Sequence, residues 1–178
     1  MVDRPPVTGG ELVALLKELF PARESTGLGV EGVGDGELVV RQPLGPGHLR
    51  PGGTVSGPTL MTLVDTAVYL ALLARDRRYV AAVTSDLHAR FLRRPSADAD
   101  LLARARLLRV GRSLATAVVE VESEGGGLVA HATVAYALPP LPDDPRRGSH
   151  GSERDEQEGA EESLARASRE PTGEGPEG

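Results

Sequence analysis

The chain has 178 residues, a formal net charge of −6 and no cysteine, which excludes a disulfide framework, a thiolate metal site and a cysteine nucleophile. The excess acidity lies in residues 141–178, which contain 11 acidic and 5 basic residues, so the rest of the chain has no charge bias toward nucleic acid or anionic lipid. The N-terminus carries no apolar signal-peptide segment, and we expect a soluble cytoplasmic protein that binds neither nucleic acid nor membrane.

The first expected elements are a flexible N-terminus over residues 1–10, a short helix and a hairpin. Leucines at helical spacing predict an amphipathic helix over residues 11–20, ended by Pro21. Two short strands over residues 27–33 and 37–42 flank Gly34-Asp35-Gly36, a sequence that favours a tight turn.

A loop rich in glycine and proline then leads into the longest apolar stretch of the chain. The loop covers residues 43–53, and Ser56 is a good N-cap for a helix that has Pro58 in its first turn. Residues 59–73 are apolar on nearly every side, which predicts a helix buried on most sides. The stretch is short and is interrupted by polar residues, so a membrane span is not expected.

Four strands are predicted after this helix, over residues 83–92, 101–110, 114–122 and 128–138. Alternation of side-chain type over residues 83–92 predicts a half-buried strand. Short turns between successive strands predict antiparallel neighbours. The fold class is therefore α+β, with one domain over residues 11–140 whose antiparallel sheet packs on the central helix. The polar segment 141–178 is expected to be a disordered acidic tail.

Asp65 is the only charged residue between Arg50 and Arg75. A buried carboxylate is costly unless it is paired or hydrogen-bonded. One interpretation puts Asp65 on an exposed stripe of the helix, or makes it a cap for a neighbouring loop. The other makes it a carboxylate held in a cleft as a base or nucleophile.

The order of these elements resembles a hotdog fold. The stretch from Gly52 to Ala67, GGTVSGPTLMTLVDTA, is similar to the signature of the phenylacetate-degradation-type (PaaI-like) acyl-CoA thioesterases. The resemblance runs from about Gly27 to Leu138, and further support comes from the segments VTSDL at 83–87, FLRRP at 91–95 and GRS at 111–113. It implies an antiparallel sheet wrapped around one long central helix.

The resemblance also implies hydrolysis of an acyl-CoA thioester. Asp65 matches the family's nucleophile or general base, Gly57 matches the glycine whose N–H holds the thioester carbonyl, and Thr84 matches the residue that orients water. The family's site is shared across a dimer interface, which implies a homodimer or homotetramer with Asp65 from one subunit and Thr84 from the other. Candidates for the phosphates of coenzyme A are Arg93, Arg94 and Arg112.

The chain departs from the family pattern beside the proposed oxyanion contact. Ser56-Gly57-Pro58 stands where the family usually has His-Gly-Gly, and Arg50 stands near the place of a polar residue such as Asn. His48 and Arg50 are candidates to take over the carbonyl-facing role, and Ser56 is a substrate-binding candidate as well as an N-cap. The four histidines have no metal-ligand spacing, so no metal or other cofactor is expected. A non-catalytic acyl-CoA-binding protein and a hotdog hydratase remain alternative functions.

Overall fold

The computed structural model describes residues 7–20, 27–34 and 36–140. Helix α1 covers Gly9–Leu19 and begins at a capping box, in which Thr8 Oγ1 accepts the Glu11 N–H at 3.3 Å and the Glu11 carboxylate accepts the Thr8 N–H at 2.8 Å. The helix therefore starts inside the segment expected to be flexible, because the cap supplies partners for its first backbone N–H groups. Residues 1–6 of that segment, and the predicted acidic tail at 141–178, lie outside the described residues.

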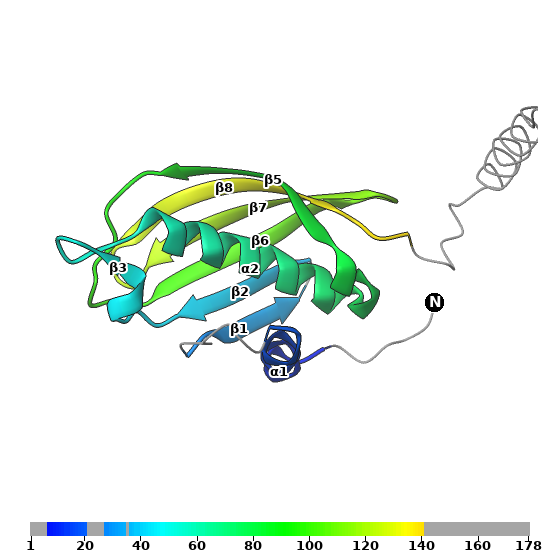
Figure 1. Ribbon diagram of the computed structural model, residues 1–178, viewed down its shortest axis with the longest axis horizontal. Helices are drawn as coiled ribbons and strands as arrows, with labels where there is room; N and C mark the ends of the chain where they lie inside the picture. The colour runs from blue at the N-terminus through cyan, green and yellow to red at the C-terminus, as the bar shows by residue number, and fades with distance from the viewer. Residues whose placement is uncertain (1–6, 21–26, 35, 141–178) are drawn as a thin grey trace, which may run out of the picture. The chain divides into compact units, whose positions relative to one another are not determined.

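A six-stranded antiparallel sheet forms the body of the protein. Its strands lie in the order β1-β2-β6-β7-β8-β5 (Figure 1). Their bounds are β1 Gly29–Gly34, β2 Glu37–Gln42, β5 Val83–Phe91, β6 Leu101–Val110, β7 Leu114–Ser123 and β8 Gly127–Ala137. The predicted α+β class, with an antiparallel sheet and one long central helix, is confirmed.

The prediction that every successive pair of strands lies side by side is wrong for β5 and β6. Strand β5 pairs with β8, whereas β6 pairs with β2 and β7. Residues 92–100 therefore cross the end of the sheet and bridge three strand spacings, about 14 Å, which a connection of this length easily spans. Local turn signals did not reveal this crossover, because sheet order depends on pairing between distant segments.

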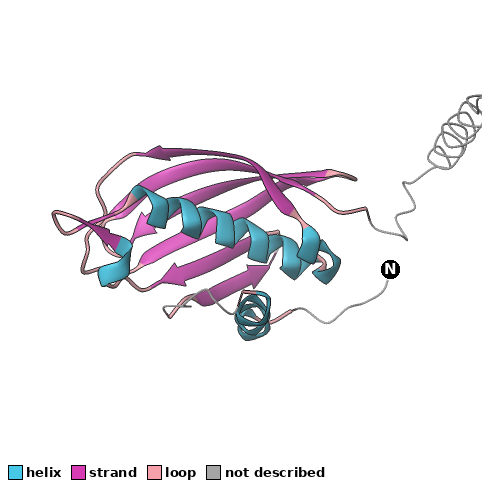
Figure 2. Cartoon of the chain, viewed as in Figure 1, coloured by secondary structure: helices cyan, strands magenta, loops and turns pink. Residues whose placement is uncertain are grey.

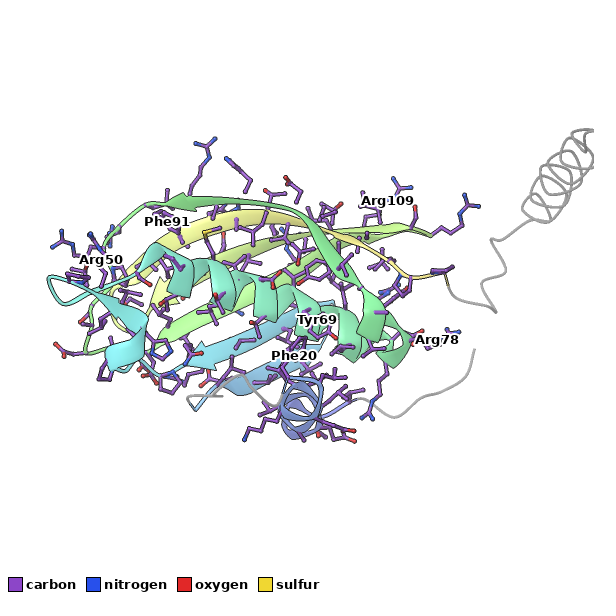
Figure 3. All side chains as sticks on the ribbon, viewed as in Figure 1. Phe20, Arg50, Tyr69, Arg78, Phe91 and Arg109 are labelled. Atoms are coloured by element: carbon purple, nitrogen blue, oxygen red, sulfur yellow. The ribbon has the colours of Figure 1, made fainter. Side chains whose placement is uncertain are left out.

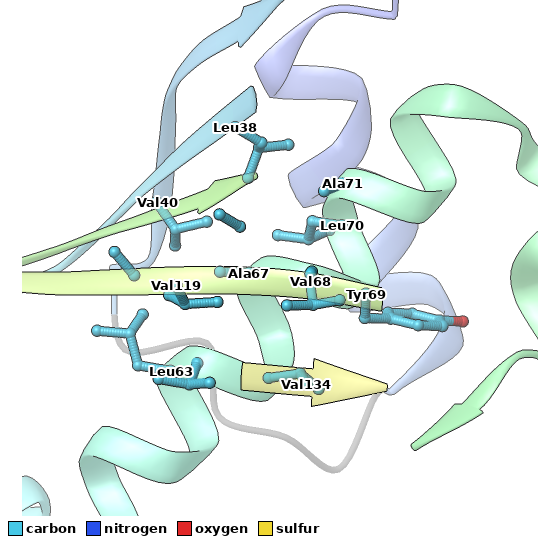
Figure 4. Close-up of a cluster of buried hydrophobic side chains, with 14 of the residues drawn as sticks. Leu38, Val40, Leu63, Ala67, Val68, Tyr69, Leu70, Ala71, Val119 and Val134 are labelled. Carbon is cyan, nitrogen blue, oxygen red and sulfur yellow. The ribbon is translucent and has the colours of Figure 1, made fainter. Parts of the chain in front are cut away.

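Helix α2, Gly57–Arg75, lies across one face of the sheet (Figures 1 and 2). Ser56 caps it as predicted, with Ser56 Oγ accepting the Thr59 N–H at 3.2 Å. Six alanines lie on the sheet face toward the helix, among larger apolar side chains, and they let the helix backbone approach closely. These fully or nearly fully buried alanines are Ala103, Ala105, Ala115, Ala117, Ala130 and Ala132. Figure 4 shows part of this core, with Ala67 and Leu70 of α2 near Val119 and Val134 of the sheet.

By length and composition α2 could cross a bilayer, since it has 19 residues and a mean hydropathy of 1.4. The helix is longer than the segment 59–73 that the sequence predicted to be apolar and helical. In the fold, 61% of an 18-residue apolar window of α2 is buried. Packing of the helix on the sheet therefore accounts for its apolar composition.

Strand β5 is more exposed than the predicted half-buried strand. Val83 and Phe91 at its two ends are 61% and 52% exposed, and only Leu87 and Ala89 are partly covered. The strand lies at the sheet edge, so one side of its backbone has no neighbouring strand in the described chain. A single copy of the fold therefore leaves this edge strand uncovered, with the apolar Val83 and Phe91 exposed at its two ends.

The segment predicted as a loop contains short regular elements. A 3₁₀ turn covers Pro46–His48, and β3, Leu49–Arg50, pairs with β4, Thr54–Val55. Gly52 and Gly53 join these two strands with φ values of 94° and 68°, a left-handed conformation that glycine adopts without strain. This hairpin leads directly into the N-terminus of α2.

Candidate active site

The Asp65 carboxylate is held by two hydroxyl groups from the sheet. Thr84 Oγ1, at the start of β5, donates to Asp65 Oδ1 at 2.6 Å. Tyr136 Oη, near the end of β8, donates to the same oxygen at 2.6 Å. Asp65 is partly buried and lines a cavity of about 480 Å³ together with both residues. Of the two interpretations of Asp65, the structure supports a carboxylate held in a cleft.

Tyr136 is the site residue that the sequence analysis missed. The alternation along β8 puts it in the same register as Ala132 and Val134, on the face that packs against α2. A tyrosine in a buried register must find a hydrogen-bond partner for its hydroxyl, which was the available signal. Burial, and secondarily its hydrogen bond to the Asp65 carboxylate, raises the pKa of Tyr136 well above 10.0, so the hydroxyl stays protonated.

Two further aromatic rings support Tyr136. Tyr69, one turn beyond Asp65 on α2, stacks on Tyr136 with ring centroids 6.4 Å apart. Phe20 packs edge-on against Tyr69 at 5.9 Å, and Figure 3 shows these two side chains next to each other. The chain has only five Phe and Tyr residues and no Trp, and three of them form this stack beside Asp65.

The first turn of α2 offers one uncommitted backbone donor. The Ser56 N–H is bonded to the His48 carbonyl and the Thr59 N–H to the Ser56 side chain. Pro58 has no N–H. Within the described residues, the Gly57 N–H has no acceptor, and it points from the positive end of the helix dipole. It is therefore the donor of this turn that is available to an oxyanion.

Gly57 and Asp65 do not meet within one chain. They are separated by eight residues of helix, which corresponds to about 12 Å along the axis. Gly57 lies instead beside the other end of β5, where a Cβ on Gly57 would be 3.5 Å from the Phe91 ring. One carbonyl cannot contact both groups of the same copy.

The structure corrects the expected division of the site between two subunits. The family resemblance implied Asp65 from one subunit and Thr84 from the other. In this structure Thr84 and Asp65 of the same chain are hydrogen-bonded, because β5 begins directly beside the middle of α2. Gly57, rather than Thr84, is the residue that lies apart from Asp65.

Three of the predicted substrate-binding arginines share a cavity with Gly57. Arg50, Arg93 and Arg94 line a space of about 480 Å³ that also contacts Phe91. Figure 3 shows Arg50 and Phe91 toward the same end of the molecule. Arg112 is not among the lining residues of this cavity. It lies in the β6–β7 turn, beside the C-terminal end of β8. Arg93 lies at the opposite end of β8, where it donates to the Gly126 carbonyl.

His48 and Ser56 line a third cavity, of about 340 Å³, beside the Asp65 cavity. The two cavities share Phe20 and Thr66 as lining residues. His48 Nδ1 accepts the Gly45 N–H at 2.9 Å, so the proton of the neutral ring is on Nε2. Among the residues that the structure describes, no group of three His, Asp or Glu side chains could hold a metal ion.

Comparison with known proteins identifies the family. The family model described as "Thioesterase superfamily" matches residues 52–130, which include the α2 N-terminus, Asp65 and Thr84. A thioesterase candidate from Silicibacter sp. TM1040 is 38% identical, with a TM-score of 0.67, and the match covers 74% of this chain and 92% of that chain. The chain belongs to the thioesterase superfamily.

Two further comparisons agree with this membership. A mutant of the phenylacetic acid degradation protein PaaI from Thermus thermophilus is 35% identical, with a TM-score of 0.59, and the match covers 67% of this chain and 99% of that chain. An esterase candidate from Halobacterium salinarum is 38% identical, and the match covers 53% of this chain but only 65% of that relative's length. The predicted PaaI-like hotdog resemblance is confirmed, and membership of the thioesterase superfamily supports thioester hydrolysis as the reaction class.

Proposed function

We propose that this protein hydrolyses an acyl-CoA thioester to a free acid and coenzyme A, with Asp65 as nucleophile or general base. The observation that carries the proposal is the Asp65 carboxylate, held at 2.6 Å by Thr84 and Tyr136 in the wall of a cavity. A fixed carboxylate beside a space for substrate suits activation of water or direct attack on a carbonyl. The thioesterase family supports the same reaction class.

In the general-base route, Asp65 accepts a proton from water while the water oxygen bonds to the thioester carbon. The carbonyl oxygen becomes an oxyanion, which the Gly57 N–H stabilises from the helix N-terminus. Collapse of the tetrahedral intermediate breaks the C–S bond, and the thiolate of coenzyme A leaves and takes up the proton from Asp65. Thr84 keeps lone pairs free to accept a hydrogen bond from the water while its own proton points to Asp65.

This route requires Asp65 of one copy and Gly57 of another, and the free edge of β5 offers a way to combine them. Thr84 and Phe91 are separated by about 23 Å of strand. Two copies of β5 that pair antiparallel about their middle would bring the Thr84 end of one copy beside the Phe91 end of the other. Because Gly57 lies beside Phe91, its N–H would then approach the Asp65 of the other copy. We therefore propose a homodimer, alone or within a tetramer, with the site at its interface.

The cavity lined by Arg50, Arg93 and Arg94 is the proposed site for the phosphates of coenzyme A. Among the residues that the structure describes, no acidic side chain lines this cavity, and the N-terminus of α2 adds its positive dipole end. Arginine suits phosphate because its guanidinium group can form two parallel hydrogen bonds.

The 340 Å³ cavity beside Asp65 is the proposed site for the acyl group. Leu16, Leu28 and Leu63 supply an apolar lining, whereas Thr59 and Thr62 add hydroxyl groups. Since this cavity shares Phe20 and Thr66 with the Asp65 cavity, an acyl group entering it would keep its carbonyl near the carboxylate.

A second candidate function is acyl-CoA binding without turnover. Pro58 in the first turn of α2 removes a backbone donor, which leaves the Gly57 N–H without a neighbouring donor in that turn. Two donors hold an oxyanion better than one, so a proline at position 58, where the family usually has glycine, favours weak or absent catalysis.

The deciding experiment measures thiol release from short-chain, long-chain and aryl acyl-CoAs by wild type and Asp65→Asn. We expect turnover by wild type and a loss of at least about 100-fold in Asp65→Asn, since the amide can neither accept the proton nor attack. Thermal unfolding of both proteins checks that the variant folds. Turnover by a folded Asp65→Asn protein at the wild-type rate would refute the proposed role of Asp65. Acyl-CoA that stabilises the wild type without being hydrolysed would establish the binding function instead.

A further inference from the structure

The two hydroxyl groups at Asp65 converge on one oxygen of its carboxylate. Thr84 Oγ1 and Tyr136 Oη each lie 2.6 Å from Oδ1, and no described residue donates to Oδ2. We propose that Tyr136 is a positioning residue, which together with Thr84 binds Oδ1 and thereby fixes Oδ2 as the oxygen that acts on water or on the thioester. This inference rests on the proposed hydrolysis at Asp65.

The direction of both hydrogen bonds follows from the chemistry of the groups. An ionised carboxylate only accepts hydrogen bonds, so both hydroxyls donate to it. Short hydrogen bonds to a charged acceptor are among the stronger ones in proteins. Rotation of the carboxylate about its Cβ–Cγ bond would break both bonds, and the free oxygen is therefore held in one direction.

Tyr136 is well supported for this role. Its side chain is 2% exposed, and its ring is stacked on Tyr69. Its hydroxyl also lies 3.1 Å from the Asp65 backbone carbonyl, which ties the end of β8 to the helix at the same residue. The hydroxyl cannot move away from Asp65 without a shift of the aromatic stack.

In the general-base route the positioned Oδ2 takes the proton from water as the new C–O bond forms. The same oxygen returns that proton to the departing thiolate when the C–S bond breaks, so the carboxylate is regenerated. Neither hydroxyl is consumed, and Tyr136 does not touch the reacting atoms. Its contribution is the orientation of the base, an effect that should appear in kcat rather than in KM.

The test compares wild type, Asp65→Asn, Tyr136→Phe and the double variant on the acyl-CoA that wild type hydrolyses fastest. Tyr136→Phe keeps the ring and its stacking and removes only the hydroxyl. We expect kcat to fall about 10- to 100-fold, as for the loss of one hydrogen bond to a charged group, with KM within about threefold of wild type. The double variant should be no slower than Asp65→Asn, because the hydroxyl acts only through Asp65.

The matched control is Tyr79→Phe, which removes the hydroxyl of another buried tyrosine, one that has no hydrogen bond to Asp65. We expect its kcat to stay within about twofold of wild type. A parallel pair at the exposed donor, Thr84→Val and Thr84→Ser, removes and restores the second hydroxyl without disturbing the core. Only Thr84→Ser should retain most of the wild-type kcat.

Each other outcome overturns the inference. If Tyr136→Phe lowers the melting temperature but leaves kcat unchanged, the hydroxyl has only a structural role. If the double variant is slower than Asp65→Asn by the full Tyr136→Phe factor, the hydroxyl acts independently of Asp65. If Tyr136→Phe does not fold, a kcat for Thr84→Val within twofold of wild type would show that the hydroxyls on Oδ1 are not needed. Absence of thiol release by wild type would remove the proposed function itself, and this inference with it.

Discussion

Gly57 and Asp65 lie on the same helix but about 12 Å apart along its axis, and they line different cavities. The first offers an uncommitted N–H at the helix N-terminus, and the second a carboxylate fixed by two hydroxyls. Because of this separation, one copy of the chain does not bring the two groups of the proposed thioesterase site together.

Subunit mixing tests whether two copies complete the site. Asp65→Asn removes the carboxylate, and Gly57→Pro removes the N–H at a position where proline suits the start of a helix. Each variant alone should be inactive. After unfolding and refolding of an equal mixture, random pairing gives heterodimers with one intact site, and we expect about a quarter of wild-type activity. An equal mixture that stays inactive, although size analysis shows dimers, would place the complete site within one chain.

Removal of Arg94 should weaken the binding of coenzyme A thioesters. Arg94 lines the cavity at the α2 N-terminus and has no hydrogen bond or ion pair in the described chain. In Arg94→Ala we expect KM to rise about tenfold, the equivalent of about 1.4 kcal/mol, with little change in kcat. The control Arg106→Ala removes an exposed arginine of β6 outside that cavity and should leave KM unchanged.

A thioester of pantetheine with the same acyl group identifies what Arg94 binds. This substrate lacks the nucleotide phosphates, so wild type and Arg94→Ala should hydrolyse it with the same KM. Equal losses on both substrates would mean that Arg94 acts elsewhere than on the phosphates. High salt should also raise the wild-type KM for the acyl-CoA, since ions screen exposed charges.

Tyr136 should make the folded protein sensitive to alkaline pH. Burial, together with the hydrogen bond to Asp65, raises the pKa of Tyr136 above the ordinary value of 10.0. A group with a raised folded-state pKa contributes stability that is fully present below its unfolded pKa and is lost as the pH rises toward the folded pKa. The melting temperature should therefore fall more steeply above pH 10 in wild type than in Tyr136→Phe.

Tyr69→Phe offers a second comparison in the same titration. Burial also raises the pKa of Tyr69, whose hydroxyl donates to the Val80 carbonyl at 2.8 Å. Loss of the Tyr69 hydroxyl should also flatten the decline of the melting temperature at alkaline pH. Parallel curves for wild type and Tyr136→Phe between pH 9 and pH 12 would contradict the assignment of that decline to Tyr136.

Thr62 should control the length of the acyl group. Its side chain is exposed in the single chain and lines the 340 Å³ cavity beside Asp65. Thr62→Phe adds a ring to that space, so we expect kcat/KM to fall at least about tenfold for long-chain acyl-CoAs and much less for acetyl-CoA. Thr62→Ser, which keeps the hydroxyl and adds no bulk, is the control. An unchanged preference in Thr62→Phe would place the acyl group elsewhere.

The sequence by itself determined the elements whose signals are local. Ser56 and Pro58 gave the start of α2, and the apolar run after them gave its burial, because caps and side-chain periodicity act within a few residues. The isolated Asp65 in that run marked the candidate site, since a lone carboxylate among apolar residues needs a compensating partner.

Only the tertiary structure decided which distant residues meet. The pairing of β5 with β8 puts Thr84 opposite Tyr136, and both hydroxyls reach Asp65. The same pairing leaves β5 at the sheet edge and moves Gly57 to the far end of that strand from Thr84. Strand order follows from the burial of the whole sheet against α2, a sum of long-range contacts that no local pattern encodes.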